Sequence, residues 1–253
     1  MVPLEISVSG QAKIKRSAER CVLTIAVQSS GDNKQRVSSE VTRTSAELTK
    51  SFKALNPRTP DGAFAADAAI TVFSVSSMNT RSWVPRRDTG EEDWEKPRQY
   101  EATSTFTVHF QHFDKMGEVL SSLFSREHVD IKSIHWKLTE STMEKLEIST
   151  RADAIKDAIS KAEAYASIIG RDVAVCSVED RSTSYRGYAS QELGRYASVA
   201  QGAAADEKDE EEDGPMIPEP EDVEVTANVE VNFIGEDESS VHRWIEKAKG
   251  PRY

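Results

Sequence analysis

Residues 100–110, YEATSTFTVHF, alternate between apolar or small side chains and polar side chains along their whole length. This period of two predicts a strand with one buried and one wetter face, which is typical of antiparallel sheets. Residues 113–124, FDKMGEVLSSLF, follow at once, and their apolar side chains recur at helical spacing behind a capping Asp114. Together the two elements predict a sheet whose apolar face is covered by an amphipathic helix.

The same alternation recurs along the chain, at Leu4–Val8, Cys21–Val27, Ile134–Leu138 and Val223–Phe233, and Ala69–Ser76 is another β-rich run. We expect the first two runs to form a hairpin through a connection near Arg16 and Ser17. Consecutive strands mixed with single helices predict an α+β fold, in which largely antiparallel sheets are covered by amphipathic helices.

Two longer helices are predicted at Asn33–Leu55 and Ser141–Gly170. The second would be roughly 44 Å long, with Ser141 and Glu144 at the spacing of a capping box and Gly170 as its stop. Its apolar stripe is rich in alanine, at Ala154, Ala158, Ala162 and Ala166. Small side chains let another backbone approach closely. The stripe therefore packs either on its own sheet or in a subunit contact that uses Ala158, Ala162 and Tyr165.

The formal charge of −11 is concentrated in one segment. Eleven acidic residues and one base, Lys208, lie between Asp206 and Glu224, so this segment carries −10 and the remainder −1. Residues 182–219 contain few large aliphatic side chains, and we expect a disordered insert with an acidic second half. Tyrosine and arginine in its first half suit weak nucleic-acid stacking, but the adjacent acids repel phosphate, so no nucleic-acid partner is expected.

The expected organisation is one domain of residues 1–181 and 220–236, the insert, and a C-terminal extension, 237–253, with a short amphipathic helix. No stretch approaches the ~18 consecutive apolar residues of a membrane helix. The start, Met1–Gly10, shows no secretory pattern, and two cysteines suit a reducing compartment. We therefore expect a cytoplasmic protein without a membrane partner.

The chain offers no strong catalytic or metal-binding motif. His109 and His112 fall on opposite faces of a strand and His135 lies on another run, so no metal site is expected. Cys21 and Cys176 are expected as small buried side chains rather than a redox pair. There is no G-x-S-x-G sequence and no phosphate-cradling glycine run. These observations predict a protein that is not an enzyme and holds no cofactor.

The loop at 81–98 joins two strands and contains Trp83, Arg86, Arg87 and Trp94. Exposed tryptophans and arginines are favoured anchors of protein interfaces. A folded-back hairpin whose charges pair internally explains the same residues equally well, so both interpretations stay open.

Three places in the chain resemble the SIMPL domain family. Ile6–Gly10 with the next strand and long helix resembles the family's opening, and Gln99–Ala102 with Phe113–Met116 resembles its middle. The most specific likeness is Arg151–Gly170, a helix of recurring alanines closed by glycine, and Val223–Phe233 is similar to the closing strand. The chain departs from the family at Ala18-Glu19, where many relatives have Pro-Asp, and in its long acidic insert.

The resemblance implies a non-catalytic role, because no enzymatic activity is established for the family. Bacterial members are exported envelope proteins linked to stress, and some resemble ring-like or channel-like homo-oligomers. A vertebrate member is similar to a cytosolic adaptor that associates with a Pelle-like kinase. We therefore expect a self-assembling, protein-interaction protein in stress response or signalling. A small-ligand-binding or stress-protective oligomer, and an enzyme of unrecognised type, are the alternatives. The expected interaction residues are Trp83, Arg86, Arg87, Trp94, Ala158, Ala162 and Tyr165.

Overall fold

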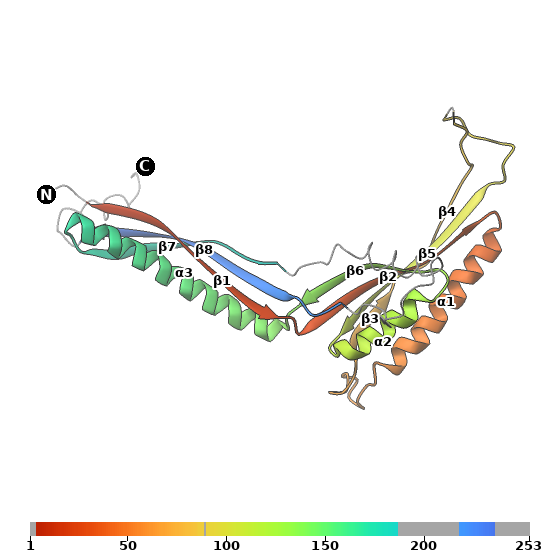
Figure 1. Cartoon of the computed structure of the whole chain (residues 1–253), viewed down its shortest axis with the longest axis horizontal. Helices are drawn as coiled ribbons and strands as arrows, with labels where there is room; N and C mark the ends of the chain where they lie inside the picture. Colours follow the sequence, from red (N-terminus) through yellow and green to blue (C-terminus); the bar gives the residue numbers. More distant parts are fainter. Residues whose placement is uncertain (1–3, 89, 187–217, 236–253) are drawn as a thin grey trace, which may run out of the picture. The chain divides into compact units, whose positions relative to one another are not determined.

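The computed structural model describes residues 4–88, 90–186 and 218–235 (Figure 1). These residues form two compact units where the sequence predicted one domain. The three-stranded unit contains residues 4–17, 138–186 and 222–235, and the five-stranded unit contains residues 18–137 and 218–221. Both sheets are antiparallel and both carry helices, which confirms the predicted α+β class.

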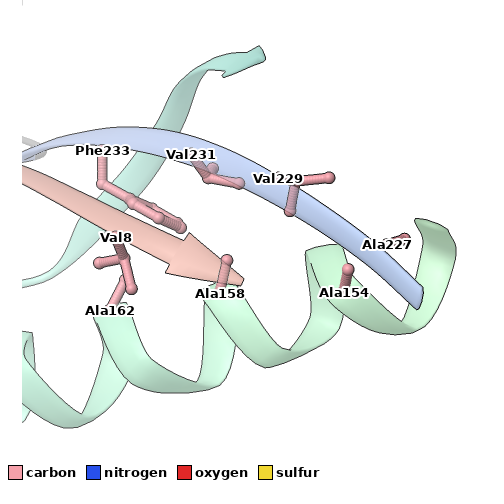
Figure 2. Close-up of a cluster of buried hydrophobic side chains, with 8 residues drawn as sticks. All are labelled: Val8, Ala154, Ala158, Ala162, Ala227, Val229, Val231 and Phe233. Atoms are coloured by element: carbon pink, nitrogen blue, oxygen red, sulfur yellow. The ribbon is translucent and has the colours of Figure 1, made fainter. Parts of the chain in front are cut away.

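The three-stranded sheet has the order β1-β8-β7, with β1 at Glu5–Ser17, β7 at Val173–Arg186 and β8 at Asp222–Gly235. One long helix, α3 at Glu140–Ile169, packs on β1 and β8 and touches β7 less. Figure 2 shows the alanines of α3 directed at the valines and the phenylalanine of the strands. The core of this unit consists of Val8, Ala154, Ala158, Ala162, Ala227, Val229, Val231 and Phe233.

The opposite face of this sheet is polar and joined across all three strands. Glu230 in the central strand accepts hydrogen bonds from Ser7 Oγ in β1 at 3.0 Å and from Arg181 Nε in β7 at 2.9 Å. Asn232 Nδ2 donates to Ser177 Oγ at 2.9 Å. The alternation along β8 thus separates a helix-covered face from a solvated one.

The five-stranded sheet has the order β3-β5-β2-β6, and β4 pairs with β5 beside β3. Its strands are β2 at Arg20–Gly31, β3 at Ile70–Val75, β4 at Asn79–Trp83, β5 at Gln99–Phe110 and β6 at Val129–Lys137. Two helices, α1 at Lys34–Ala54 and α2 at Phe113–Phe124, pack on this sheet, α1 on β2 and β5 and α2 on β6.

Aromatic pairs hold the helices on this sheet. Phe52 of α1 meets Phe106 of β5 edge-on, with ring centroids 5.8 Å apart. Phe113, at the start of α2, meets Trp136 of β6 with centroids 5.2 Å apart. Phe52, Phe106 and Trp136 are each buried, so the face predicted as apolar in residues 100–110 is the one that the helices cover.

The predicted hairpin of the first two strands is wrong. β1 pairs with β8 over Glu5–Ser17, whereas β2 pairs with β5 and β6 in the other sheet. Alternation shows that a strand has a buried face, but it does not say which strand supplies the hydrogen bonds.

The helix ends follow the sequence in part. Asn33 caps α1 by accepting from the N–H groups of Gln35 and Arg36, and Gly170 ends α3 in the left-handed conformation at φ 71°. The predicted capping box of α3 and the Asp114 cap are wrong: Thr139 and His112 occupy the N-cap positions, neither with a side-chain cap hydrogen bond.

The predicted start of the insert, at residue 182, is too early. β7 continues through Ser182 to Arg186 because these residues pair with the start of β8, Thr183 opposite Ala227 and Tyr185 opposite Val225. Residues 187–217 of the expected insert lie outside the described residues, and so does the C-terminal extension with its expected helix. The last residues of the expected insert, 218 and 219, are described and lead into β8.

Candidate functional site

A loop of the five-stranded unit forms the candidate site. β4 pairs with the first half of β5, from Asn79 opposite Thr103 to Trp83 opposite Gln99. We call residues 79–98 the arm; the structure describes all of it except residue 89. The arm consists of β4 and the loop that joins β4 to β5 beyond the end of their pairing (Figure 1). Its position therefore follows from the pairing of two strands that are adjacent in sequence.

Asp93 braces the arm from within. It is only 8% exposed, and its carboxylate lies 3.1 Å from Arg87 Nε and 3.8 Å from Lys96 Nζ. The backbone N–H of Glu95 donates to the same carboxylate at 3.3 Å, and Asp93 N–H donates to the Pro85 carbonyl at 2.8 Å. These contacts give the loop a defined shape without a helix or long strands.

The charges around Asp93 also set its protonation. Burial by itself raises the pKa of this carboxyl, but the hydrogen bonds from Arg87 and from the N–H of Glu95, with the charges of Arg87 and Lys96, bring the pKa below its usual value. The brace is therefore an ionised carboxylate held between two cations.

The arm presents the tryptophans that the sequence singled out. Trp94 follows the buried Asp93 and is 72% exposed. Trp83 ends β4, is partly exposed, and has the guanidinium of Arg81 5.3 Å from its ring centroid. Arg81 is in turn bound to Glu101 at 2.7 Å. The charges of the loop thus pair internally, as the folded-back interpretation predicted, and Trp94 stays exposed; the interface interpretation stays a prediction.

The two predicted arginines of the arm have different surroundings. Arg87 is bound to Asp93 and lies 3.5 Å from Glu95, so it belongs to the brace. Arg86 is exposed and forms a backbone bridge with Glu92 that closes the loop. Both arginines are exposed, but Arg87 is engaged by the brace.

The stripe alanines of α3 are not surface residues. Ala158 and Ala162 are fully buried against the three-stranded sheet, so the suggested subunit contact through them is wrong and the alternative, packing on their own sheet, holds. Tyr165 of the same helix is exposed. The structure does not bring Tyr165 together with the arm in one unit.

The histidines and cysteines are spread over the fold. His109 and His135 lie on either side of Val22, on neighbouring strands, and burial followed by the charge of Lys137 lowers the pKa of His109. Among the described residues, no three His, Cys, Asp or Glu side chains gather to hold a metal ion. Burial raises the pKa of the Cys21 thiol to about 12, and Cys176 donates to the Asn232 carbonyl at 3.1 Å.

Sequence reasoning missed an open strand edge next to the arm. In the described part of the chain, β3 and β4 each pair with β5 alone, so their other side is unpaired. Residues 70–83, ITVFSVSSMNTRSW, contain one charged side chain. Edge strands are usually protected by charge, so this composition gave no local signal that the stretch lies at an edge.

The fold defines the structural class of the protein. It is an α+β protein in which two antiparallel sheets are each covered by helices on one face. The chain belongs to the SIMPL family, described as a protein of unknown function (DUF541), whose family model matches residues 6–233. No curated protein matches the chain. None of the described helices is long and apolar enough to cross a bilayer.

Proposed function

We propose that this SIMPL-family protein is non-catalytic, self-assembles, and binds proteins through the arm. The observation that carries the proposal is an exposed Trp94 on a loop braced by a buried, doubly paired Asp93. A large aromatic side chain held in place loses little conformational freedom on binding, which is why such residues dominate interface energies.

Charge supports the self-assembly part of the proposal. Outside residues 206–224 the chain carries a formal charge of −1, so little long-range repulsion opposes the meeting of two copies. We place the protein in the cytoplasm, in stress response or signalling; its free cysteines, Cys21 and Cys176, suit a reducing compartment.

The test is the mass of the full chain in solution, measured by light scattering after size exclusion across the micromolar range. We expect a mass of two or more chains, each of 28.1 kDa. Trp94→Ala should raise the dissociation constant roughly tenfold or more if Trp94 is an interface anchor. Ile168→Ala is the matched control, because it also truncates an exposed apolar side chain but lies at the end of α3.

A wild-type chain of 28.1 kDa at every concentration would contradict self-assembly. An assembled chain in which Trp94→Ala and Ile168→Ala behave alike would remove the arm from the interface and leave self-assembly in place.

A further inference from the structure

Strand edges distinguish one surface of this protein from the others. The outer edge of β1 is capped by α3: the Asp157 carboxylate accepts from Gln11 N–H at 2.9 Å, and Lys161 Nζ donates to the Ser9 carbonyl at 3.0 Å. Two side chains of a helix thus take the place of a neighbouring strand. This edge is not available for pairing along its middle.

The edges of β7 and β6 are protected in other ways. β7 has two register shifts, one between Val175 and Ser177 and one between Asp180 and Ser182, and bulges twist an edge away from a straight partner. β6 has a shift of its own and carries the charged residues Asp130, Lys132 and Lys137. Both edges bear the devices that natural sheets use against edge-to-edge association.

The edge of β3 and β4 is less protected, because the register shift within its strands lies at the start of β3, between Ile70 and Val72. Its one charged side chain, Arg81, is already bound to Glu101 at 2.7 Å. Val72, Val75, Met78 and Trp83 are apolar and each between 39% and 51% exposed. An edge with one already paired charge and exposed apolar side chains, and with no neighbouring strand in the described part of the chain, is the kind of surface to which another strand adds.

The backbone groups that point away from the sheet can be assigned. Ser76 N–H donates to the Thr105 carbonyl and Thr105 N–H donates to Ser76 Oγ, both at 2.8 Å, so the backbone of Thr105 faces this edge. Because such groups alternate along an antiparallel strand, Thr103 and Glu101 of β5 also face the edge. Their partners on β4 are Asn79 and Arg81, which therefore point inward.

The remaining residues of the edge point outward. On β3 these are Phe73 and Val75, and on β4 they are Thr80 and Ser82. The side chains of Thr80 and Ser82 lie on the helix side of the sheet, since Thr80 is opposite the buried Ala102 and Ser82 is two residues further along the same face. Each outward residue offers one N–H and one carbonyl to an incoming strand.

A second irregularity, where β3 passes into β4, selects the partner of this edge. Ser76 lies opposite Thr105 and Asn79 lies opposite Thr103, so β5 advances by two residues while the edge advances by three. One extra residue between Ser76 and Asn79 changes the phase of the outward groups. A regular strand matches β3 or β4 but not both in succession, whereas a strand with the same extra residue matches both.

We propose that this edge pairs, antiparallel and about a two-fold axis, with the same edge of a second copy of the chain. The axis passes between Ser77 and Met78, so that each copy places its extra residue opposite that of the other. The proposal rests on the self-assembly proposed above and names the surface that carries it. Across the axis, Val75 pairs with Thr80, Phe73 with Ser82, Ser74 with Arg81, and Val72 with Trp83.

This register satisfies the geometry of an antiparallel strand pair. Outward residues meet outward residues, and side chains that meet lie on the same face of the joined sheet. Val72 contacts Trp83 of the second copy, and no like charges are opposite each other, because Arg81 faces Ser74. The joined edge also brings the arm, which continues from Trp83, to the border of the interface.

The first test removes an outward N–H. In Thr80→Pro the single chain loses no ladder hydrogen bond, because proline is tolerated at an edge residue whose N–H faces away from the sheet. Because a two-fold axis relates the two copies, the substitution removes the hydrogen bond of the residue 80 N–H at two places in the interface and introduces two steric clashes. We therefore expect the dissociation constant to rise on the order of tenfold to a hundredfold. Thr80→Val is the matched control; it keeps the N–H and should assemble like the wild type.

The second test reads the register through disulfides, in a Cys176→Ser background. A mixture of Ser74→Cys and Arg81→Cys chains should form a cross-linked pair on oxidation, because residues opposite each other at a non-hydrogen-bonded position have Cα atoms about 4.5 Å apart. A mixture of Ser74→Cys and Thr80→Cys chains is the control, since the residue at 80 lies on the other face.

The outcomes separate the two proposals. A wild-type monomer overturns both. An assembled wild type that Thr80→Pro leaves unchanged, with circular dichroism showing both variants folded, overturns the edge pairing alone. Equal cross-linking in the two cysteine mixtures overturns the register. Dissociation of Thr80→Pro but not Thr80→Val, with cross-linking in the first mixture only, supports the proposal.

Discussion

The backbone of Gly10 in β1 lies directly against the carbonyl oxygen of Ala154 in α3. A Cβ placed on Gly10 would be 2.0 Å from that oxygen and 2.8 Å from the Cβ of Ala158. The helix and the strand therefore touch backbone to backbone, and small residues on both sides permit it. The alanine stripe of α3 and Gly10 of β1 together allow this close approach.

Gly10→Ala should destabilise the three-stranded unit. The methyl group has no space, so β1 or α3 must move, at a cost of about 1–3 kcal/mol or more in the free energy of unfolding. Urea denaturation followed by circular dichroism measures the change. Gly31→Ala is the control, because its Cβ would lie 3.5 Å from Val37 Cγ2, an ordinary contact. Equal losses in the two variants would show that the close approach is not the cause.

Asp157→Asn should weaken the cap on the edge of β1 in a pH-dependent way. The hydrogen bond from Lys161, followed by that from Gln11 N–H, lowers the pKa of Asp157 below its ordinary value of 3.8. A depressed pKa contributes stability that is present above the unfolded value and is lost as the pH falls through the folded value. The side chain is about one-third exposed, so we expect a loss below about 1 kcal/mol near neutral pH.

The measurement is the difference in unfolding free energy between wild type and Asp157→Asn, near neutral pH and at about pH 3. The difference should shrink at the lower pH. Asp153→Asn is the control: Asp153 pairs with Lys156 at 2.9 Å along the helix. A difference for Asp157→Asn that grows on acidification would refute the cap.

Cys21 should resist thiol reagents in the folded protein. Burial raises its pKa to about 12, and the side chain has no measurable exposure, so thiolate is scarce and inaccessible near pH 8. Cys176 is half-buried and should react first. With a chromogenic disulfide reagent we expect one thiol per chain to react quickly and the second only on addition of denaturant; fast reaction of both would contradict the buried position.

Asp93→Asn should loosen the arm. The substitution keeps the shape of the side chain but removes the charge that holds Arg87 and Lys96. Limited trypsin digestion should then cut faster at Arg86, Arg87 or Lys96, and the digestion of the rest of the chain should not change. Glu95→Gln is the control, because Glu95 contacts the same Arg87 at 3.5 Å from an almost fully exposed position. Equal cleavage rates in the two variants would show that burial of Asp93 is not what braces the arm.

The buried face of β5 was predictable because its pattern is local. Ala102, Phe106, Val108 and Phe110 are buried as the alternation indicated, and the helix at 113–124 follows as its spacing predicted. The left-handed Gly170 at the end of α3 was predictable for the same reason. Side-chain periodicity and helix ends depend on residues that are neighbours in sequence, so a single sequence is enough to place them.

The candidate site was predictable only in part. Trp83 and Trp94 were named from residue type, but the buried Asp93 that braces the arm carries no distinguishing pattern in a loop with many charges of both signs. Likewise, nothing local distinguished an alanine stripe that packs on its own sheet from one that meets another subunit. Both questions depend on contacts between residues far apart in the chain.

The sequence by itself determined most of the strands and helices, that the alanine helix needs a close neighbour, and that the chain resembles the SIMPL family. Only the tertiary structure decided that β1 pairs with β8, that Gly10 is the close neighbour, and that the edge of β3 and β4 stays open. The physical reason is that side-chain periodicity records burial of a face. The identity of the covering element depends on backbone hydrogen bonds and packing between segments that the sequence order does not place together.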